Sequence, residues 1–296
     1  MYKFDMQLFA VDAKTVKAAD LAKVRDVDFT ERFVADIGTL MKMLGVTRKI
    51  EKRAGETLKV YKVTGTLESG VVAEGEVIPL SKYSTTYAPI GEATLKKWRK
   101  QTTAEAISSK GYGQAVNDTN NKMLKDIQKG IRSQFVTFLG TGTATATGVG
   151  LQAAMAQIWG KMQVLYEDTA VQTVYFMNPL DVADYLASAN ITLQTAFGMT
   201  YVENFLGLGT LIMNASVPKG KIYATAKDNI VLYYIPVNGA DLQEVFTFTT
   251  DATGYIGIHE EPDYTNMTAS DTVINGMELF AERLDGVIVG TIGAGE

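Results

Sequence analysis

The chain has 296 residues, of which 46% are hydrophobic, which suffices for one large or two modest packed domains and excludes global disorder. It has no cysteine and one histidine, His259, which excludes disulfides, thiolate chemistry and histidine clusters for metal binding. A net charge of −5 is unlike that of a protein whose main task is to grip nucleic-acid phosphates. No apolar run is long enough to form a membrane helix, and the opening MYKFDMQLFA lacks the apolar stretch of a secretory signal.

The N-terminal segment predicts an arm followed by a helix. Residues 1–28 mix small and charged side chains without an apolar stripe, which indicates an arm. Apolar residues then recur at helical spacing from Phe33 to Leu44. Thr30 is the candidate cap of this helix, and Gly45 follows its end.

The next segment predicts extended structure. Residues 56–90 alternate between apolar and polar side chains, which is typical of strands, but they include Pro79 and Pro89. Proline is excluded from the middle of a sheet, so we expect an edge strand or a projecting hairpin. The alternating EATLKKWRKQTT and the short helical AEAISSK follow.

A long helix is predicted over residues 115–139, because an apolar stripe extends from Val116 to Phe138 and Gly140 follows. At 1.5 Å per residue this helix would be roughly 37 Å long. The segment GTGTATATGVG at 140–150 is typical of a small-residue linker and is the best internal boundary.

The second half mixes helices and strands. It predicts a helix over 151–165, a strand in VQTVYFMN, a helix that begins at Pro179, and a buried hairpin formed by KIYAT and NIVLYYIP. Extended runs such as YIGIHEE and GVIVGTIG complete the chain. Because no regular βαβ repeat is present, the pattern indicates an α+β protein.

The sequence offers little enzyme chemistry. Gly140 and Gly142 lack the third glycine and the preceding strand of a dinucleotide-binding loop, and no nucleotide-binding P-loop or G-x-S-x-G motif occurs. The segment HEEPD (259–263) is the nearest approach to an acid–base or metal site, but a solvated loop is the simpler interpretation. We therefore expect no catalytic residue, no cofactor and no metal.

Basic residues form two clusters at either end of the predicted hairpin. Residues 48–53 carry +3 and residues 96–100 carry +4, which leaves −12 on the rest of the chain. The hairpin base is therefore predicted to be a positive patch. It could bind nucleic acid with Trp98 stacking on a base, meet carboxylates of another subunit, or be a solvated surface; self-association is the preferred interpretation.

The order of these parts resembles the major capsid protein of tailed bacteriophages, with the Hong-Kong-phage-type capsid fold. Segments that resemble this family are MQLFA, LGVTRKIEKRAGETLKVYKV, AEGEVIPLSKY, YVENFLG, VPKGKIYATAKDN and LFAERLDGVIVGTIG. Each segment is a weak signal, whereas their shared order is a strong one. The resemblance covers nearly the whole chain.

The resemblance implies a division into named parts. They are an N-terminal arm (1–28), a helix and lead-in (29–53), an E-loop (54–92), a P-domain (93–140 and 240–280, with its spine helix at about 115–139) and an A-domain (141–239 and 281–296).

The resemblance also implies a function. The subunit would self-assemble as pentamers and hexamers into the icosahedral head shell of a virion, assembled in the host bacterial cytoplasm around double-stranded DNA. Its partners would be further copies of itself, a separate scaffolding protein, a portal protein at one vertex and weakly contacted DNA, with no membrane. Some relatives form Lys–Asn crosslinks in the E-loop, but nothing in this sequence indicates that Lys59 or Lys62 does so.

Candidate contact residues between subunits combine the charged clusters, the hairpin and HEEPD: Arg48, Lys49, Lys52, Arg53, Lys59, Tyr61, Lys62, Glu74, Glu76, Lys96, Lys97, Arg99, Lys100, Glu260, Glu261 and Asp263. Reversal of Lys96, Lys97 and Lys100 to glutamate is expected to block assembly and to leave folding intact. The alternatives are an encapsulin-type nanocompartment shell, a phage tail or neck subunit, and a hydrolase that uses His259.

Overall fold

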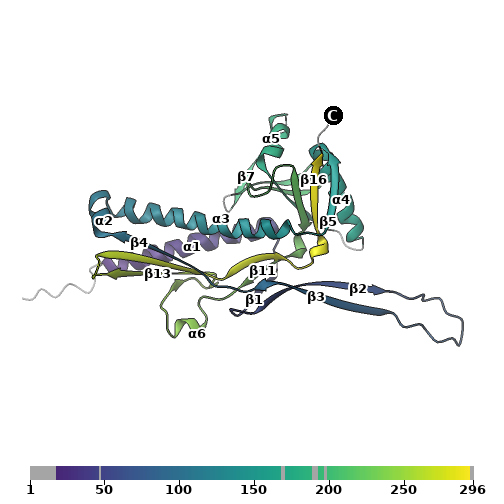
Figure 1. Cartoon of the computed structure of the whole chain (residues 1–296), viewed down its shortest axis with the longest axis horizontal. Coiled ribbons are helices and arrows are strands. Elements are labelled where there is room, and N and C mark those ends of the chain that lie inside the picture. The colour runs from purple at the N-terminus through teal and green to yellow at the C-terminus, as the bar shows by residue number, and fades with distance from the viewer. Residues whose placement is uncertain (1–17, 47, 168–170, 189–192, 197–198, 294–296) are drawn as a thin grey trace, which may run out of the picture.

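The computed structural model describes residues 18–293, apart from 47, 168–170, 189–192 and 197–198. Its body is crossed by a long helix, and a two-stranded hairpin projects away from it (Figure 1). No helix within the described ranges is long and apolar enough to span a membrane. The helices are α1 (Ala18–Leu44), α2 (Ala104–Lys110), α3 (Thr119–Leu139), α4 (Gly150–Leu165), α5 (Pro179–Ser188) and α6 (Ala240–Gln243), with a π-helical turn η1 (Gly113–Asp118) and 3-10 turns η2 (Lys227–Asn229) and η3 (Leu284–Gly286).

A seven-stranded mixed sheet forms one end of the body. Its strand order is β5-β16-β10-β6-β9-β8-β7, with β5 parallel to β16 and β6 parallel to β9. The helix α4 packs on this sheet, and an apolar core that includes Met155, Ile158 and Met162 lies between the helix and the sheet. The strands are β5 (Ala144–Val149), β6 (Thr173–Met177), β7 (Gln194–Ala196), β8 (Met199–Phe205), β9 (Gly209–Met213), β10 (Lys221–Ala226) and β16 (Val287–Gly293).

Three smaller sheets make up the rest. A four-stranded sheet has the order β12-β13-β14-β4, a three-stranded sheet has the order β1-β11-β15, and β2 pairs with β3 in the hairpin. The largest core packs α1 and α3 against the four-stranded and three-stranded sheets and part of the seven-stranded sheet, with Phe33, Ile37 and Phe135 buried in it. The strands are β1 (Arg48–Glu51), β2 (Thr57–Thr66), β3 (Lys82–Glu92), β4 (Lys96–Thr103), β11 (Ile230–Tyr234), β12 (Thr249–Thr250), β13 (Ile256–Asp263), β14 (Thr268–Asn275) and β15 (Met277–Ala281).

The predicted arm is wrong in its second half. The helix α1 already begins at Ala18, and Thr30 is a buried residue inside it instead of its cap. Residues 18–28 (AADLAKVRDVD) are rich in strong helix formers, so propensity favours a helix where an apolar stripe is missing. The rest of the predicted arm, residues 1–17, lies outside the described residues.

The predicted linker at 140–150 is wrong, because β5 runs through it and pairs with β16. The small residues of this segment allow β5 and α4 to pack closely together. A Cβ at Gly148 in β5 would lie only 2.3 Å from the backbone nitrogen of Ala154 in α4, so a larger residue would push the helix away from the strand. The predicted KIYAT–NIVLYYIP hairpin is also wrong. Strand β10 belongs to the seven-stranded sheet, whereas β11 pairs with β1 and β15. Residues 230–234, which the resemblance grouped with the rest of 141–239, therefore lie in a different sheet from β10.

The interpretation of HEEPD as a solvated loop is wrong too, because residues 259–263 continue β13 and pair with β14. Strand β12 covers only Gly257 and Ile258, so among the described strands none pairs with the other side of β13 at Pro262. Proline is tolerated on such an edge because its missing N–H removes no essential ladder bond.

Candidate assembly surface

The projecting hairpin is the most exposed part of the described chain. All residues of β3 except Ile90 are exposed, and the ten residues of β2 span about 33 Å. Leu58 and Val60, near the base of β2, are buried, whereas Val63 is 54% exposed. Only the base of the hairpin therefore packs on the body, and an isolated two-stranded ribbon is marginally stable in water.

The tip of the hairpin, residues 67–81, carries apolar side chains into solvent. Val71 and Val77 are 92% exposed and Leu80 is 93% exposed. The tip has three glutamates, at 68, 74 and 76, and no basic residue. Glu76 accepts a hydrogen bond from the backbone N–H of Ala73 at 3.3 Å, which closes a local turn. An apolar, acidic loop of this kind is typical of a protein–protein contact.

The base of the hairpin packs into a third apolar core around Leu58, Ala93 and Phe280. Two backbone hydrogen bonds, Gly55 N–H to Ala93 O and Ala93 N–H to Glu56 O, each measure 2.8 Å. The ion pair with Lys52, together with the Arg53 amide, lowers the pKa of Glu56 below its ordinary value. These contacts fix where the hairpin leaves the body.

Glu282 connects the hairpin to the start of the chain's last segment. Its carboxylate forms an ion pair with Arg48 of β1, and this contact raises the pKa of the Arg48 guanidinium. Its carbonyl oxygen accepts a hydrogen bond from the Tyr61 amide of β2 at 3.3 Å. Glu282 thus joins β1, β2 and β15 at one point.

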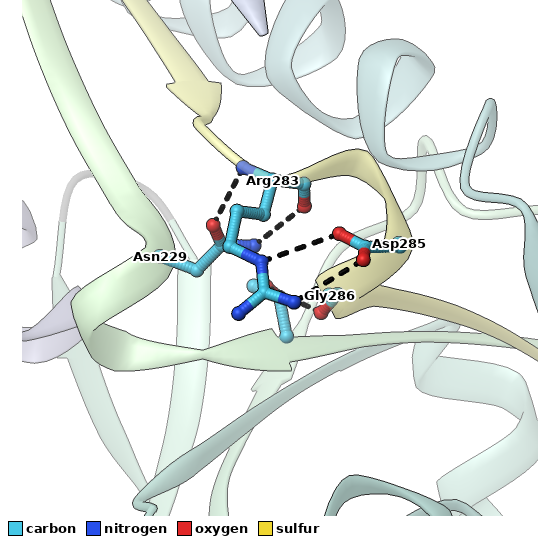
Figure 2. A network of polar contacts seen from close by, with 5 residues as sticks. Asn229, Arg283, Asp285 and Gly286 are labelled. Atoms are coloured by element: carbon cyan, nitrogen blue, oxygen red, sulfur yellow. Dashed lines mark hydrogen bonds and ion pairs between the residues drawn. The ribbon is translucent and has the colours of Figure 1, made fainter. Parts of the chain in front are cut away.

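The chain passes twice between the seven-stranded and three-stranded sheets, once through η2 and once through η3. Side chains and backbone groups at these two crossings contact one another beside Glu282 (Figure 2). We call this cluster the joint, and it consists of Thr225, Asn229, Arg283, Asp285 and Gly286. The Asn229 side chain donates to the Arg283 carbonyl at 2.9 Å and accepts from the Arg283 amide at 2.8 Å. It also donates to Thr225 Oγ1 at 3.0 Å. Arg283 in turn donates two hydrogen bonds to the Asp285 carboxylate, at 3.2 and 3.3 Å.

Further contacts close the joint. Thr225 Oγ1 donates to the Gly286 carbonyl at 3.0 Å, and the Arg283 guanidinium lies 5.4 Å from the Tyr166 ring centroid. A Cβ at Gly286 would lie 2.5 Å from the Tyr166 hydroxyl, so only glycine fits here without a shift. Asn229 therefore ties both crossings between the sheets together.

Part of the predicted positive patch is neutralised within the chain. Lys100 Nζ lies 2.8 Å from the Asp271 carboxylate, which is almost fully buried, and Lys96 Nζ lies 3.4 Å from that of Glu278. Reversal of Lys100 to glutamate would place two carboxylates together, so we now expect the triple reversal to destabilise the subunit as well as to block assembly. Lys97 and Arg99 point outwards on the same strand, and Arg99 donates to Ser270 at 3.0 Å.

The remaining candidate contact residues are scattered. Lys49 lies 5.9 Å from the Tyr255 ring centroid, and Lys59 lies 6.0 Å from that of Tyr87 within the hairpin. Glu74 lies in the tip, Arg53 at the hairpin base, and Lys62 on β2, where its side chain lies outside the described residues. The members of this set whose side chains the structure describes do not form one site.

The acidic segment Glu260, Glu261 and Asp263 lies along β13. Thr265 donates two hydrogen bonds to Asp263 and lowers the pKa of its carboxyl group. His259 packs edge-on against Phe248, with ring centroids 6.4 Å apart. Among the described residues, no group of three or more His, Asp or Glu side chains could hold a metal ion.

Two features of this surface were missed by the sequence analysis. The apolar tip had a visible signal, because VVAEGEVIPL places six apolar residues in a segment bounded by turns. The joint at Asn229 and Arg283 had none, since its residues are 54 positions apart and are joined only by the fold.

No protein-family model and no curated protein sequence matches the chain. Solved structures do. The capsid asymmetric unit of cyanophage A-1(L) superposes with a TM-score of 0.56 at 14% identity, over 85% of this chain and 92% of that one. The mature capsid of bacteriophage PhiM1 gives 0.52 at 7% identity, over 84% and 86%. The SrpI encapsulin complex of Synechococcus elongatus PCC 7942 gives 0.51 at 12% identity, over 84% and 86%.

The chain has the Hong-Kong-phage-type capsid fold. At these identities the superposition establishes the arrangement of elements and nothing finer. The α+β class predicted from the sequence is confirmed, and so is the capsid fold that the resemblance implied. The exposed hairpin and the joint at Asn229 are described above from this chain's own contacts, and the superposition adds no residue-level detail to them.

Proposed function

We propose that the chain is a structural protein that self-assembles into a closed shell. The single observation that carries this proposal is the exposed hairpin: a long ribbon with an apolar tip is unstable in water unless other subunits cover it. Contacts of this kind join different surfaces of two copies, and they close into rings when the rotation between the copies permits. The proposal assigns no catalytic, cofactor or metal site.

Within the capsid fold we propose that the hairpin region 54–92 acts as the E-loop, and that 93–140 with 240–280 forms the P-domain around α3. For the A-domain we propose the seven-stranded sheet with its helices, which runs from residue 141 to η2 and from η3 onward. The domain would therefore end near residue 227 instead of 239.

Our finer proposal is a phage head protein that forms pentamers and hexamers around double-stranded DNA, in a virion assembled in the host cytoplasm. The sequence segments that resemble phage capsid proteins support it. A scaffolding protein, a portal protein and weak contact with packaged DNA belong to the same proposal. The chain's net charge of −5 suits a wall that must not hold DNA tightly.

The second candidate is an encapsulin-type shell that encloses other proteins. The superposition on the SrpI encapsulin supports it, because its TM-score of 0.51 is close to the 0.52 of the PhiM1 capsid. The two candidates share the fold and differ in what the particle contains.

Negative-stain electron microscopy of the concentrated protein in moderate salt tests both candidates. Closed shells or capsomer rings are the expected result, whereas tubes alone would favour a tail or neck subunit. Nuclease-protected DNA inside the shells would support the phage proposal, and co-purified enzyme would support the encapsulin. Monodisperse monomers at every salt and protein concentration, and with host lysate added, would contradict self-assembly.

A further inference from the structure

A groove of about 530 Å³ lies between the four-stranded sheet and the segment 242–248, on the face of the sheet that points away from α1. Figure 1 shows α1 and α6 on opposite sides of β13. The register agrees, because Ile258 and Val273 belong to the core that includes α1, whereas their neighbours His259 and Thr272 line the groove. The apolar residues of the lining are Leu95, Leu242, Val245, Phe246, Phe248 and Ile274.

The rim of the groove exposes apolar side chains to solvent. Val245 is 74% exposed and Phe246 is 54% exposed, on the short segment that follows α6. Phe248, two residues further on, packs edge-on against His259 on the floor of the groove. Large exposed apolar side chains beside an apolar hollow are typical of a surface that another segment covers.

A segment with a matching apolar face occurs in the sequence before α1, which begins at Ala18. Over residues 2–8 (YKFDMQL), four large apolar side chains alternate with three polar ones. Alternation with a period of two is the pattern of an extended segment, and it differs from the helical stripe that residues 1–28 lack. In an extended conformation, residues 2–8 would present one apolar face and one polar face.

The chain is long enough to bring this segment to the groove. Helix α1 packs against β12 and β13, so Ala18 begins a helix on the sheet that carries the groove. The ten residues from Leu8 to Ala18 span at most about 33 Å when extended. Packed layers lie about 10 Å apart, so this length suffices to pass round the sheet from the face of α1 to the face of the groove.

Charge also favours this segment as the occupant. The groove lining includes one basic residue, Lys97, and one acidic residue, Glu261, both with exposed side chains. Residues 2–8 likewise carry one charge of each sign, at Lys3 and Asp5. The other exposed apolar segment, the hairpin tip, has three glutamates and no basic residue, and it would bring like charges to Glu261.

We propose that residues 2–8 of the same chain occupy this groove, with their apolar side chains against Phe246 and Phe248. The contact ties the start of the chain to the outer face of the four-stranded sheet, opposite the face that α1 covers. It is made within one subunit, so it does not depend on shell formation. The proposal can therefore fail or succeed separately from the proposed function.

The test measures how fast a maleimide labels a single cysteine in the groove of dissociated subunits. The chain has no cysteine, so Val245→Cys introduces a unique thiol. We expect this thiol to react about tenfold more slowly in the full chain than in a chain that lacks residues 2–8, which corresponds to a groove occupied in about nine molecules of ten. Val164→Cys, at a residue 75% exposed on α4, is the matched control and should react equally fast in both chains.

Point variants separate the apolar face from the mere presence of the segment. Phe4→Ser combined with Leu8→Ser keeps the length and the charge of the segment, and it should speed the labelling of Val245→Cys as much as the deletion does. Gln7→Ser, on the polar face, should leave the rate unchanged.

Two results would overturn the proposal. One is equal labelling of Val245→Cys in the full and the shortened chain. The other is protection that appears only as the protein concentration rises and is lost in the variant Val71→Ser, Val77→Ser and Leu80→Ser. That result would assign the groove to the hairpin tip of a second copy. Protection by residues 2–8 that is independent of protein concentration is the result the proposal predicts.

Discussion

Asn229 holds the joint together through its side chain. The side chain makes three hydrogen bonds, to Thr225 and to both the amide and the carbonyl of Arg283. The Asn229 side chain is also buried, so if it were removed, water could not take its place as hydrogen-bond partner of Thr225 and Arg283. The residue therefore contributes more to stability than a surface asparagine does.

We expect Asn229→Ala to lower the free energy of unfolding of the unassembled subunit by about 1–3 kcal/mol, since it leaves buried donors and acceptors unpaired. Urea denaturation measures the change. Asn266→Ala, in the exposed turn between β13 and β14, is the control and should change it by less than about 0.5 kcal/mol. Equal changes in the free energy of unfolding for the two variants would mean that the hydrogen bonds of Asn229 do not stabilise the subunit.

The ion pair between Lys100 and Asp271 makes a second prediction. Lys100→Met leaves a carboxylate that is only 2% exposed without its cation, and we expect a loss of about 3 kcal/mol. Lys97→Met, on the exposed side of the same strand, should have almost no effect. The melting temperatures of both variants are compared with that of the unmodified subunit. An unchanged melting temperature of the Lys100→Met subunit would show that the ion pair does not stabilise the fold.

At the scale of elements, the two ends of the hairpin have different roles: its base stabilises the folded subunit, and its tip is available for contacts with other subunits. Its base packs in an apolar core, while the apolar side chains Val71, Val77 and Leu80 of its tip are almost fully exposed to water. Substitutions at the tip should therefore leave the folded subunit unchanged and act only on contacts between subunits.

We expect the triple variant Val71→Ser, Val77→Ser and Leu80→Ser to keep the melting temperature of the subunit and to reduce the assembled fraction at least tenfold, as three apolar contacts are lost. Sedimentation velocity measures the assembled fraction. Tyr264→Ser, at a residue 79% exposed elsewhere on the body, is the control for loss of surface apolar area. A lower melting temperature of the triple variant would mean that the tip belongs to the core.

The elements differ in how far the sequence predicted them. The helix over 115–139 was predicted because its apolar stripe faces the core, and the structure has η1 and α3 there. The helices at 151–165 and from Pro179 are also present. Strand β5 was missed because alternating Ala and Thr carry little hydrophobic signal. Strands β10 and β11 were paired wrongly because adjacency in the sequence does not reveal that η2 redirects the chain to another sheet.

Most candidate contact residues were chosen for their charge, and charge does not reveal a partner. Arg48, Lys96 and Lys100 have carboxylate partners that lie far away in the sequence, at 282, 278 and 271. Only the three-dimensional structure brings these pairs together. A contact between subunits remains a prediction for the outward-facing Lys97 and Arg99.

For the whole molecule, apolar contacts and basic–acidic contacts between subunits make opposite predictions about salt. Each subunit carries −5, so like subunits repel one another at low ionic strength. Contacts between an apolar tip and an apolar surface are not weakened by salt, whereas contacts between basic and acidic patches are.

We therefore expect the assembled fraction to rise as sodium chloride increases from about 50 mM to about 500 mM, where the Debye length becomes shorter than a typical contact region. Static light scattering at fixed protein concentration measures it. A steady fall with salt would instead favour the basic patch as the main contact between subunits.

Labelling of a single cysteine at the hairpin tip tests the central claim most directly. The chain has no cysteine, so Val77→Cys introduces a unique thiol at a residue 92% exposed in the subunit. We predict that a maleimide labels it rapidly in dissociated subunits and slowly in sedimented particles, because a neighbouring subunit covers the tip. Equal rates in the two states would contradict assembly through the hairpin.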